Sequence, residues 1–228
     1  LLDQSVSHVP FLRYEYLTTW WQTRGGGEWP NAALALVTAR ADGKLVGAAP
    51  LFHAEYNGQP ALLNLGAIEI SDYLDLLARP EHLEGFLFGL LPFLRSAALP
   101  EWRAVHFFNL LDSSPTAAAL QAAAAQAGWT AAEERLQHSP YIPLPGDWEA
   151  YLSRIDKKQR HEIRRKMRRL ESSGTPWRWY VVVDPETLDA EIDAFLALMA
   201  QDPEKATFLT PPMREHMRLT MRCAFAAG

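Results

Sequence analysis

The sequence is poor in the features that disulfide-stabilised, zinc-binding and membrane-spanning proteins share. Its one cysteine, Cys223, cannot form an internal disulfide, and one thiol is too few for a cysteine-based zinc site. Gly89 and Pro92 interrupt the longest apolar run, residues 86–94, well short of the ~18 residues that a membrane helix needs. Residues 1–25 lack the basic start and apolar run of a signal peptide. These absences predict a protein of the reducing cytoplasm without a membrane span.

The chain also lacks an excess of basic residues. Its 228 residues include 22 Lys and Arg against 27 Asp and Glu, which gives a formal net charge of -5. The molecule as a whole is therefore not a general polyanion binder, and any function that needs cations must be local. A hydrophobic content of 48% in a chain of this length allows one or two domains with a real core.

Two kinds of pattern follow one another in residues 1–145. Apolar segments joined by Asp42-Gly43 and Asn57-Gly58 come first, and these dipeptides are typical of tight hairpins. Alternating strands and helices come next. The predicted helices are residues 11–23, 81–97 and 116–126, and the predicted strands are residues 33–40, 45–53, 61–65, 71–78, 104–108 and 137–144. This order indicates an α/β (α+β) fold with a mixed sheet flanked by helices, and the stiff segment 143–146 marks the end of a first domain.

Residues 146–228 differ from the first domain because helices dominate them. We expect one long helix over residues 147–172, a strand over 177–183, a helix over 186–200 and a last helix capped by Thr210. A lone strand leaves its backbone donors and acceptors unpaired. Its partner must come from the first domain's sheet or from residues beyond 228, and the second alternative predicts an incomplete second domain.

The sharpest chemical feature is a cationic run within the expected long helix. Residues 154–169 contain nine Lys or Arg against two acids. On a helix Arg160 and Arg164 align one turn apart, with Lys157 one turn before Arg160. Because a guanidinium can grip two phosphate oxygens, Lys157, Arg160 and Arg164 are candidate phosphate-binding residues for coenzyme A, a nucleotide-linked sugar or a tRNA end. The alternative is a solvated helix face whose side-chain stems cover apolar surface.

A second candidate site lies in the expected strand 71–78. Asp72 or Asp75 could accept a proton from an amine, and Tyr73 could protonate a leaving thiolate. The alternative is that both acids face water at a strand end while Tyr73 belongs to the core.

Several segments together resemble the Fem-like, CelD-like branch of the GNAT acyltransferases. The resemblance to the start of that branch's second repeat lies in Asp147-Trp148-Glu149, Lys157-Lys158-Gln159-Arg160 and the basic run 164–171. Residues 11–21, with paired tryptophans, residues 41–51, which end in Pro-Leu, and Gly66 followed by residues 71–75 resemble earlier segments of the family.

The resemblance implies two GNAT-like folds in tandem, with residues 146–228 as the opening of the second. It also implies transfer of an acyl or aminoacyl group to a small-molecule amine or hydroxyl, in a bacterial cell-envelope or polysaccharide pathway. Acyl-CoA, acyl carrier protein or aminoacyl-tRNA would be the donor, no cofactor would be covalently bound, and tRNA would be the one nucleic acid expected. The sequence indicates no oligomeric state.

One family feature is not found in the sequence. A Gln/Arg-x-x-Gly-x-Gly/Ala segment between a strand and a helix cradles pyrophosphate in working GNAT domains, and residues 40–45 carry only its first half, in a hairpin. This leaves open an alternative function, in which a non-catalytic, degenerate GNAT-like module binds a partner protein or nucleic acid through the basic helix.

Overall fold

The computed structural model describes residues 1–66, 68, 70–96 and 99–228. The chain divides into two compact units. The first, here called the sheet unit, consists of residues 1–134 and 184–228. The second, here called the basic unit, consists of residues 135–183.

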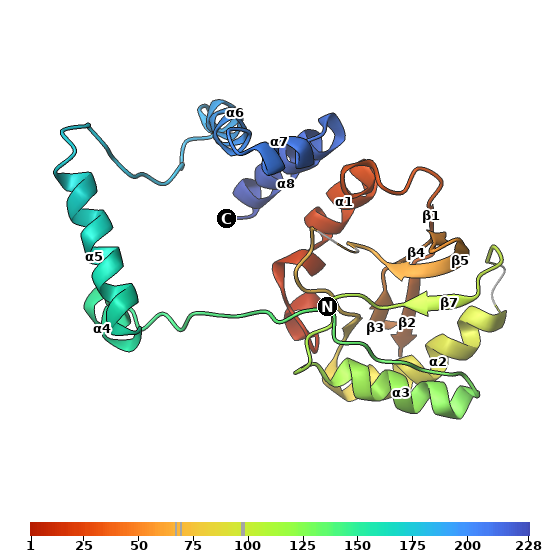
Figure 1. Ribbon diagram of the computed structural model, residues 1–228. Helices are drawn as coiled ribbons and strands as arrows, with labels where there is room; N and C mark the ends of the chain where they lie inside the picture. The colour runs from red at the N-terminus through yellow and green to blue at the C-terminus, as the bar shows by residue number, and fades with distance from the viewer. Residues whose placement is uncertain (67, 69, 97–98) are drawn as a thin grey trace. The chain divides into compact units, whose positions relative to one another are not determined.

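The sheet unit contains two small sheets (Figure 1). The larger has the strand order β1-β4-β5-β7 and consists of β1 (Ala33–Leu34), β4 (Leu51–Tyr56), β5 (Gln59–Asn64) and β7 (Ala104–His106). The smaller has the order β2-β3-β6 and consists of β2 (Val37–Ala41), β3 (Lys44–Ala49) and β6 (Leu77–Ala78). Strands β5 and β7 are parallel, with Leu62 opposite Val105, whereas β4 and β5 are antiparallel. The predicted mixed sheet is therefore confirmed.

The hairpin turns are confirmed, but two of the predicted strands are each divided in two. Asp42 and Gly43 have φ of 49° and 76°, and Asn57 and Gly58 have φ of 50° and 72°, as a type I′ turn requires. The predicted strand 45–53 is two strands in different sheets, β3 and β4, separated by Pro50, which has no N–H to donate to a ladder. The predicted strand 33–40 likewise divides into β1 and β2.

Two other strand predictions are wrong. Of residues 71–78 only Leu77–Ala78 pairs, as β6, and residues 137–144 form no strand. The predicted strand 104–108 is confirmed as β7.

The helix predictions for the first domain are confirmed. They correspond to α1 (Tyr14–Gly27), α2 (Leu83–Ser96) and α3 (Pro115–Ala127), together with single 3₁₀ turns at Leu2–Gln4, Pro10–Leu12 and Pro80–His82. Regular helix in α1 ends before Arg24, where φ turns positive, and α3 runs from its Ser114 cap to a left-handed Gly128. Residue 97, the predicted end of the second helix, lies outside the described residues.

Helices cover both faces of the larger sheet (Figure 1). Ala61 and Leu63 of β5 pack in one cluster with Trp20 of α1. Leu62 between them packs in a second cluster with Leu87 of α2 and other residues of α2 and α3. Successive strand residues point to opposite faces, so this alternation places the sheet between α1 on one side and α2 with α3 on the other.

The end of the chain returns to the sheet unit as α6 (Leu188–Met199), α7 (Pro203–Phe208) and α8 (Pro211–Ala227), of which α8 packs on α1. The first and last of these helices were predicted, and Thr210 caps α8 as expected. Helix α7 was missed, although Asp202-Pro203 is an N-cap followed by proline at the first helical position. Gly26 allows the close approach to α8, because a Cβ there would lie 2.6 Å from Met213 Cε.

The basic unit consists of α4 (Trp148–Arg154), α5 (Lys157–Glu171) and irregular segments on either side. The prediction of one helix over residues 147–172 is wrong, because Ile155 is extended and Asp156 starts a new helix by accepting bonds from Lys158 N and Gln159 N. The predicted strand 177–183 does not form. Its side chains are largely in solvent, as the 81% exposure of Trp179 shows.

Candidate functional site

The carboxyl ends of the parallel strands β5 and β7 lie at one edge of the larger sheet. In α/β proteins ligands bind outside such edges, where the chain leaves the strands as loops. A reciprocal pair joins the two loops: Asn64 Nδ2 donates to Phe108 O at 3.1 Å, and Phe108 N donates to Asn64 Oδ1 at 3.0 Å. These two hydrogen bonds hold the ends of the two loops together at the sheet edge.

Asn109 explains why residues 71–76 are not a strand. Its φ is 58°, and its Nδ2 donates to Ile68 O at 2.9 Å and to Ser71 O at 2.6 Å. Leu74 N donates to Asn109 O at 3.0 Å. Backbone groups that a ladder would use are thus bonded to one asparagine, which shapes the segment as a loop beside the sheet edge.

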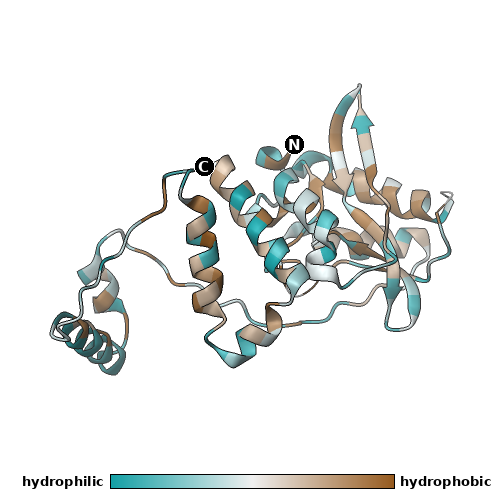
Figure 2. Cartoon of the chain, turned by 90° about the horizontal axis from the view of Figure 1, so that it is seen from above, coloured by the Kyte–Doolittle hydropathy of each residue, from teal (hydrophilic) through white to brown (hydrophobic). Residues whose placement is uncertain are grey.

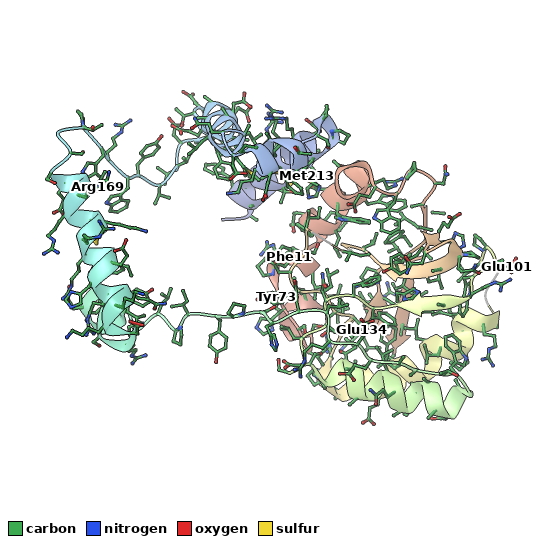
Figure 3. All side chains as sticks on the ribbon, in the orientation of Figure 1. Phe11, Tyr73, Glu101, Glu134, Arg169 and Met213 are labelled. Atoms are coloured by element: carbon green, nitrogen blue, oxygen red, sulfur yellow. The ribbon has the colours of Figure 1, made fainter. Side chains whose placement is uncertain are left out.

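Asp72 and Tyr73 lie in this loop rather than on a strand. Asp72 is exposed, and Tyr73 is half-buried with its ring centroid 6.4 Å from that of Phe11 (Figure 3). The structure therefore brings the two predicted residues to the carboxyl edge of the sheet, one facing water and one packed against an aromatic ring.

Tyr16 of α1 belongs to the same edge and was missed in the sequence. Its hydroxyl donates to Ile70 O at 3.0 Å and lies 2.7 Å from Ser71 Oγ. Burial raises the pKa of Tyr16 to about 12, opposed by the Ser71 hydrogen bond and reinforced by the Asp72 carboxylate. A phenol this weakly acidic stays protonated at neutral pH. No sequence signal singled it out, because its partners are more than fifty residues away along the chain.

Asp75 is buried, with 1% exposure, rather than facing water at a strand end. Its Oδ2 accepts from Ser7 Oγ at 2.5 Å and from Ser114 Oγ at 2.6 Å, and its Oδ1 accepts from Leu76 N at 2.7 Å. Ser114 is also the N-cap of α3, accepting from Thr116 N at 3.2 Å. One carboxylate therefore joins the N-terminal segment, the loop before β6 and the start of α3.

A cavity of about 370 Å³ lies beside this carboxylate. Its lining combines hydroxyl, imidazole and apolar side chains: Val6, Ser7, His8, Val9, Pro10, Leu111, Ser113 and Ser114. Two of these, Ser7 and Ser114, are the residues that donate to Asp75. The volume lies in the range of small-molecule sites.

The other three predicted residues lie on α5 in the basic unit. Arg160 Nη1 donates to Leu152 O at 3.1 Å, and Arg164 Nη2 pairs with Glu149 Oε2 at 2.5 Å. Both guanidinium groups thus hold α5 against α4. Lys157 is exposed and forms no ion pair with any residue that the structure describes.

Further along α5 the charges are only partly neutralised. Glu162 accepts from Arg165 and lies 3.7 Å from Lys166 Nζ. The Arg165 hydrogen bond lowers the pKa of Glu162. Arg168 and Arg169 are exposed, and within the described ranges no carboxylate pairs with either (Figure 3). Helix α5 is accordingly one of the most hydrophilic ribbons of the chain (Figure 2).

The residue types of the pyrophosphate pattern do occur at Gln22-Thr23-Arg24-Gly25-Gly26-Gly27. This segment is the C-terminal end of α1 rather than the start of a helix, so the unpaired backbone groups there are carbonyls, which repel anions. Packing accounts for the glycines: a Cβ on Gly25 would lie 2.6 Å from Trp20 Nε1. The segment supports the approach of α8 rather than phosphate binding.

Comparison with protein families gives one match, of residues 157–228 to the acetyltransferase (GNAT) domain. Comparisons with curated proteins and with solved structures found no match. Among the described residues, no helix has both the length and the apolar character to cross a bilayer. Residues 157–228 are thus similar to a GNAT domain, and GNAT domains transfer acyl groups and generally take acetyl-CoA as co-substrate.

Proposed function

We propose that this chain is part of an acyltransferase that moves an acyl group from acyl-CoA, acyl carrier protein or aminoacyl-tRNA to an amine or hydroxyl of a small molecule. The match of residues 157–228 to the GNAT domain carries the proposal. The match starts at Lys157, the first residue of α5, so Lys157, Arg160 and Arg164 all lie within the matched segment. The Fem-like, CelD-like branch and the cell-envelope or polysaccharide setting rest on the sequence resemblance.

In this proposal residues 1–145 form a first GNAT-like domain and residues 146–228 open a second. The mixed sheet with helices on both faces supports the first part. The second part is supported by Val181 and Val183, whose β-branched side chains favour strands but are 71% and 77% exposed, in a segment where the described part of the chain forms no strand. Amide exchange should be fast there and should slow when the chain is extended along its reading frame. Equally fast exchange in the extended chain would reject the second domain.

Lys157, Arg160 and Arg164 are proposed to hold the phosphates of the donor. A guanidinium has five N–H donors, and the contacts to α4 use Nη1 of Arg160 and Nη2 of Arg164. The remaining donors can bind phosphate oxygens while the α4 contacts persist. Lys157 adds an unpaired ammonium one turn earlier.

Asp72 and Tyr73 are proposed to serve the acceptor. An attacking amine forms the new C–N bond at the thioester carbonyl and gives its proton to a carboxylate, here Asp72. The C–S bond breaks, and the departing thiolate takes a proton from a phenol, here Tyr73. Proximity and backbone hydrogen bonds to the developing oxyanion lower the barrier further.

Calorimetric titration with coenzyme A tests the phosphate site. Lys157→Gln and Arg164→Gln should each weaken binding about three- to tenfold, as expected for removal of a partly exposed phosphate contact. Glu149→Gln breaks the same contact between α4 and α5 without removing a cation, and Lys44→Gln removes one charge from the β2–β3 hairpin. Both controls should bind like wild type. Failure of the wild-type chain to bind coenzyme A would refute the donor site.

A second function, a non-catalytic module that binds nucleic acid or an acidic partner through α5, is favoured by the unpaired Lys157, Arg168 and Arg169. It predicts polyanion binding whose affinity falls steeply with salt and no saturable coenzyme A binding.

A further inference from the structure

Two side chains that line the cavity beside Asp75, Ser7 and Ser114, already donate their hydroxyl hydrogens within the protein. A serine hydroxyl has one hydrogen. Ser7 and Ser114 both give theirs to Asp75 Oδ2, at 2.5 Å and 2.6 Å. Ser114 Oγ also accepts from Thr116 N, whereas no described residue donates to Ser7 Oγ. Toward the cavity Ser7 can therefore only accept, and it suits a ligand that donates.

The electrostatics favour a donor that is also a cation. Asp75 is 1% exposed and forms no ion pair with any described residue. The nearby N-terminus of α3 offsets at most about half of its charge. No Lys or Arg lines the cavity. A negative potential therefore reaches the cavity through two polarised hydroxyl groups, and it repels carboxylates and phosphates.

The rest of the lining suits an alkyl group. Val6, Val9, Pro10 and Leu111 provide apolar walls around the hydroxyl side. A ligand with an ammonium head and a short hydrocarbon body would place donors against Ser7 and hydrocarbon against these walls.

We propose that this cavity is a binding site for a small primary ammonium compound, which donates to Ser7 Oγ and is attracted by the Asp75 carboxylate behind it. The site belongs to the sheet unit alone and requires no donor bound at α5, so it stands or falls separately from acyl transfer.

The test is an NMR titration of the isotope-labelled chain with three four-carbon probes: n-butylammonium, 1-butanol and butyrate, at constant ionic strength. Butylammonium should give saturable amide shifts centred on Ser7, His8, Ser113 and Ser114. Butanol should bind at least about tenfold more weakly, because it lacks the charge, and butyrate should not bind. Equal binding of butanol, or shifts scattered over the surface, would overturn the proposal.

Variants separate attraction by Asp75 from a general effect of net charge. Asp75→Asn should weaken butylammonium at least about tenfold, whereas Asp42→Asn, which removes one charge from the β2–β3 turn, should leave it unchanged. If Asp75→Asn does not fold, Ser7→Ala, which removes the free acceptor but keeps the carboxylate, should weaken it several-fold. Ser113→Ala is its matched control, since Ser113 lines the cavity without bonding to Asp75. Wild-type affinity in Ser7→Ala and Asp75→Asn would refute the site.

Discussion

Replacing Asp75 by alanine is the most informative test of how the sheet unit is held together. The change removes three hydrogen bonds, from Ser7 Oγ, Ser114 Oγ and Leu76 N. Ser7 is half-buried and its hydroxyl can donate to water instead, so the loss of its bond to Asp75 changes the free energy of unfolding little. The other two donors lose a charged acceptor in a part-buried or buried setting, at about 1–3 kcal/mol each. We therefore expect the free energy of unfolding to fall by about 2–6 kcal/mol.

Urea unfolding followed by tryptophan fluorescence measures this loss. The midpoint should fall at an unchanged slope, because the native surface is not altered. Asp72→Ala is the matched control: it removes an exposed carboxylate three residues earlier and should change stability by no more than about 0.5 kcal/mol. A loss below about 1 kcal/mol in Asp75→Ala would show that the three bonds do not stabilise the fold. A double-mutant cycle that combines Asp75→Ala with Ser7→Ala then isolates the coupling energy between Asp75 and Ser7.

Three further predictions concern the packing of α8 on α1 and the start of α5. Burial lowers the pKa of His216, whose Nδ1 lies 2.7 Å from the Thr23 hydroxyl, so the unfolded chain binds a proton more readily. The contribution of neutral His216 to the free energy of unfolding is then present above pH 6.5 and is lost as the pH falls from 6.5 toward the lowered pKa of the folded state. Measured against pH, the stability of His216→Gln should lack this dependence. Gly26→Ala should cost about 1–3 kcal/mol in urea unfolding, through positive φ and contact with Met213. Gly43→Ala, with positive φ but open space, should cost less. Asp156→Ala removes the cap of α5 and should lower its stability by about 1 kcal/mol, seen as reduced helical circular dichroism, whereas Ser153→Ala should not.

The sequence predicted those features whose causes are local. The turns at Asp42-Gly43 and Asn57-Gly58 and the cap at Thr210 depend on residues within a few positions of each other, so their signals can be read directly. The break at Asp156 has such a local signal too, because an aspartate ahead of a helical run is a typical N-cap.

Features that depend on distant partners were not predicted. Asn109 bonds to the backbone of Ile68, Ser71 and Leu74, and Ser7 bonds to Asp75 across 68 positions. Neither contact leaves a periodic pattern in the sequence. For the same reason Tyr16 was missed. Asp72 and Tyr73 were expected on a strand and lie in a loop instead. Their roles, like those of Lys157, Arg160 and Arg164, stay predictions.

The packing of α8 on α1 has a consequence for how the chain is made. Thr19 and Cys223 lie 3.4 Å apart although 204 positions separate them, so the face of α1 that α8 covers stays open until residues 211–227 have left the ribosome. Closing so long a loop adds little equilibrium cost but delays the last step. Newly made molecules therefore pass through a stage in which this face of α1 is exposed to other proteins. Ribosomes stalled before Pro211 would hold the chain at that stage.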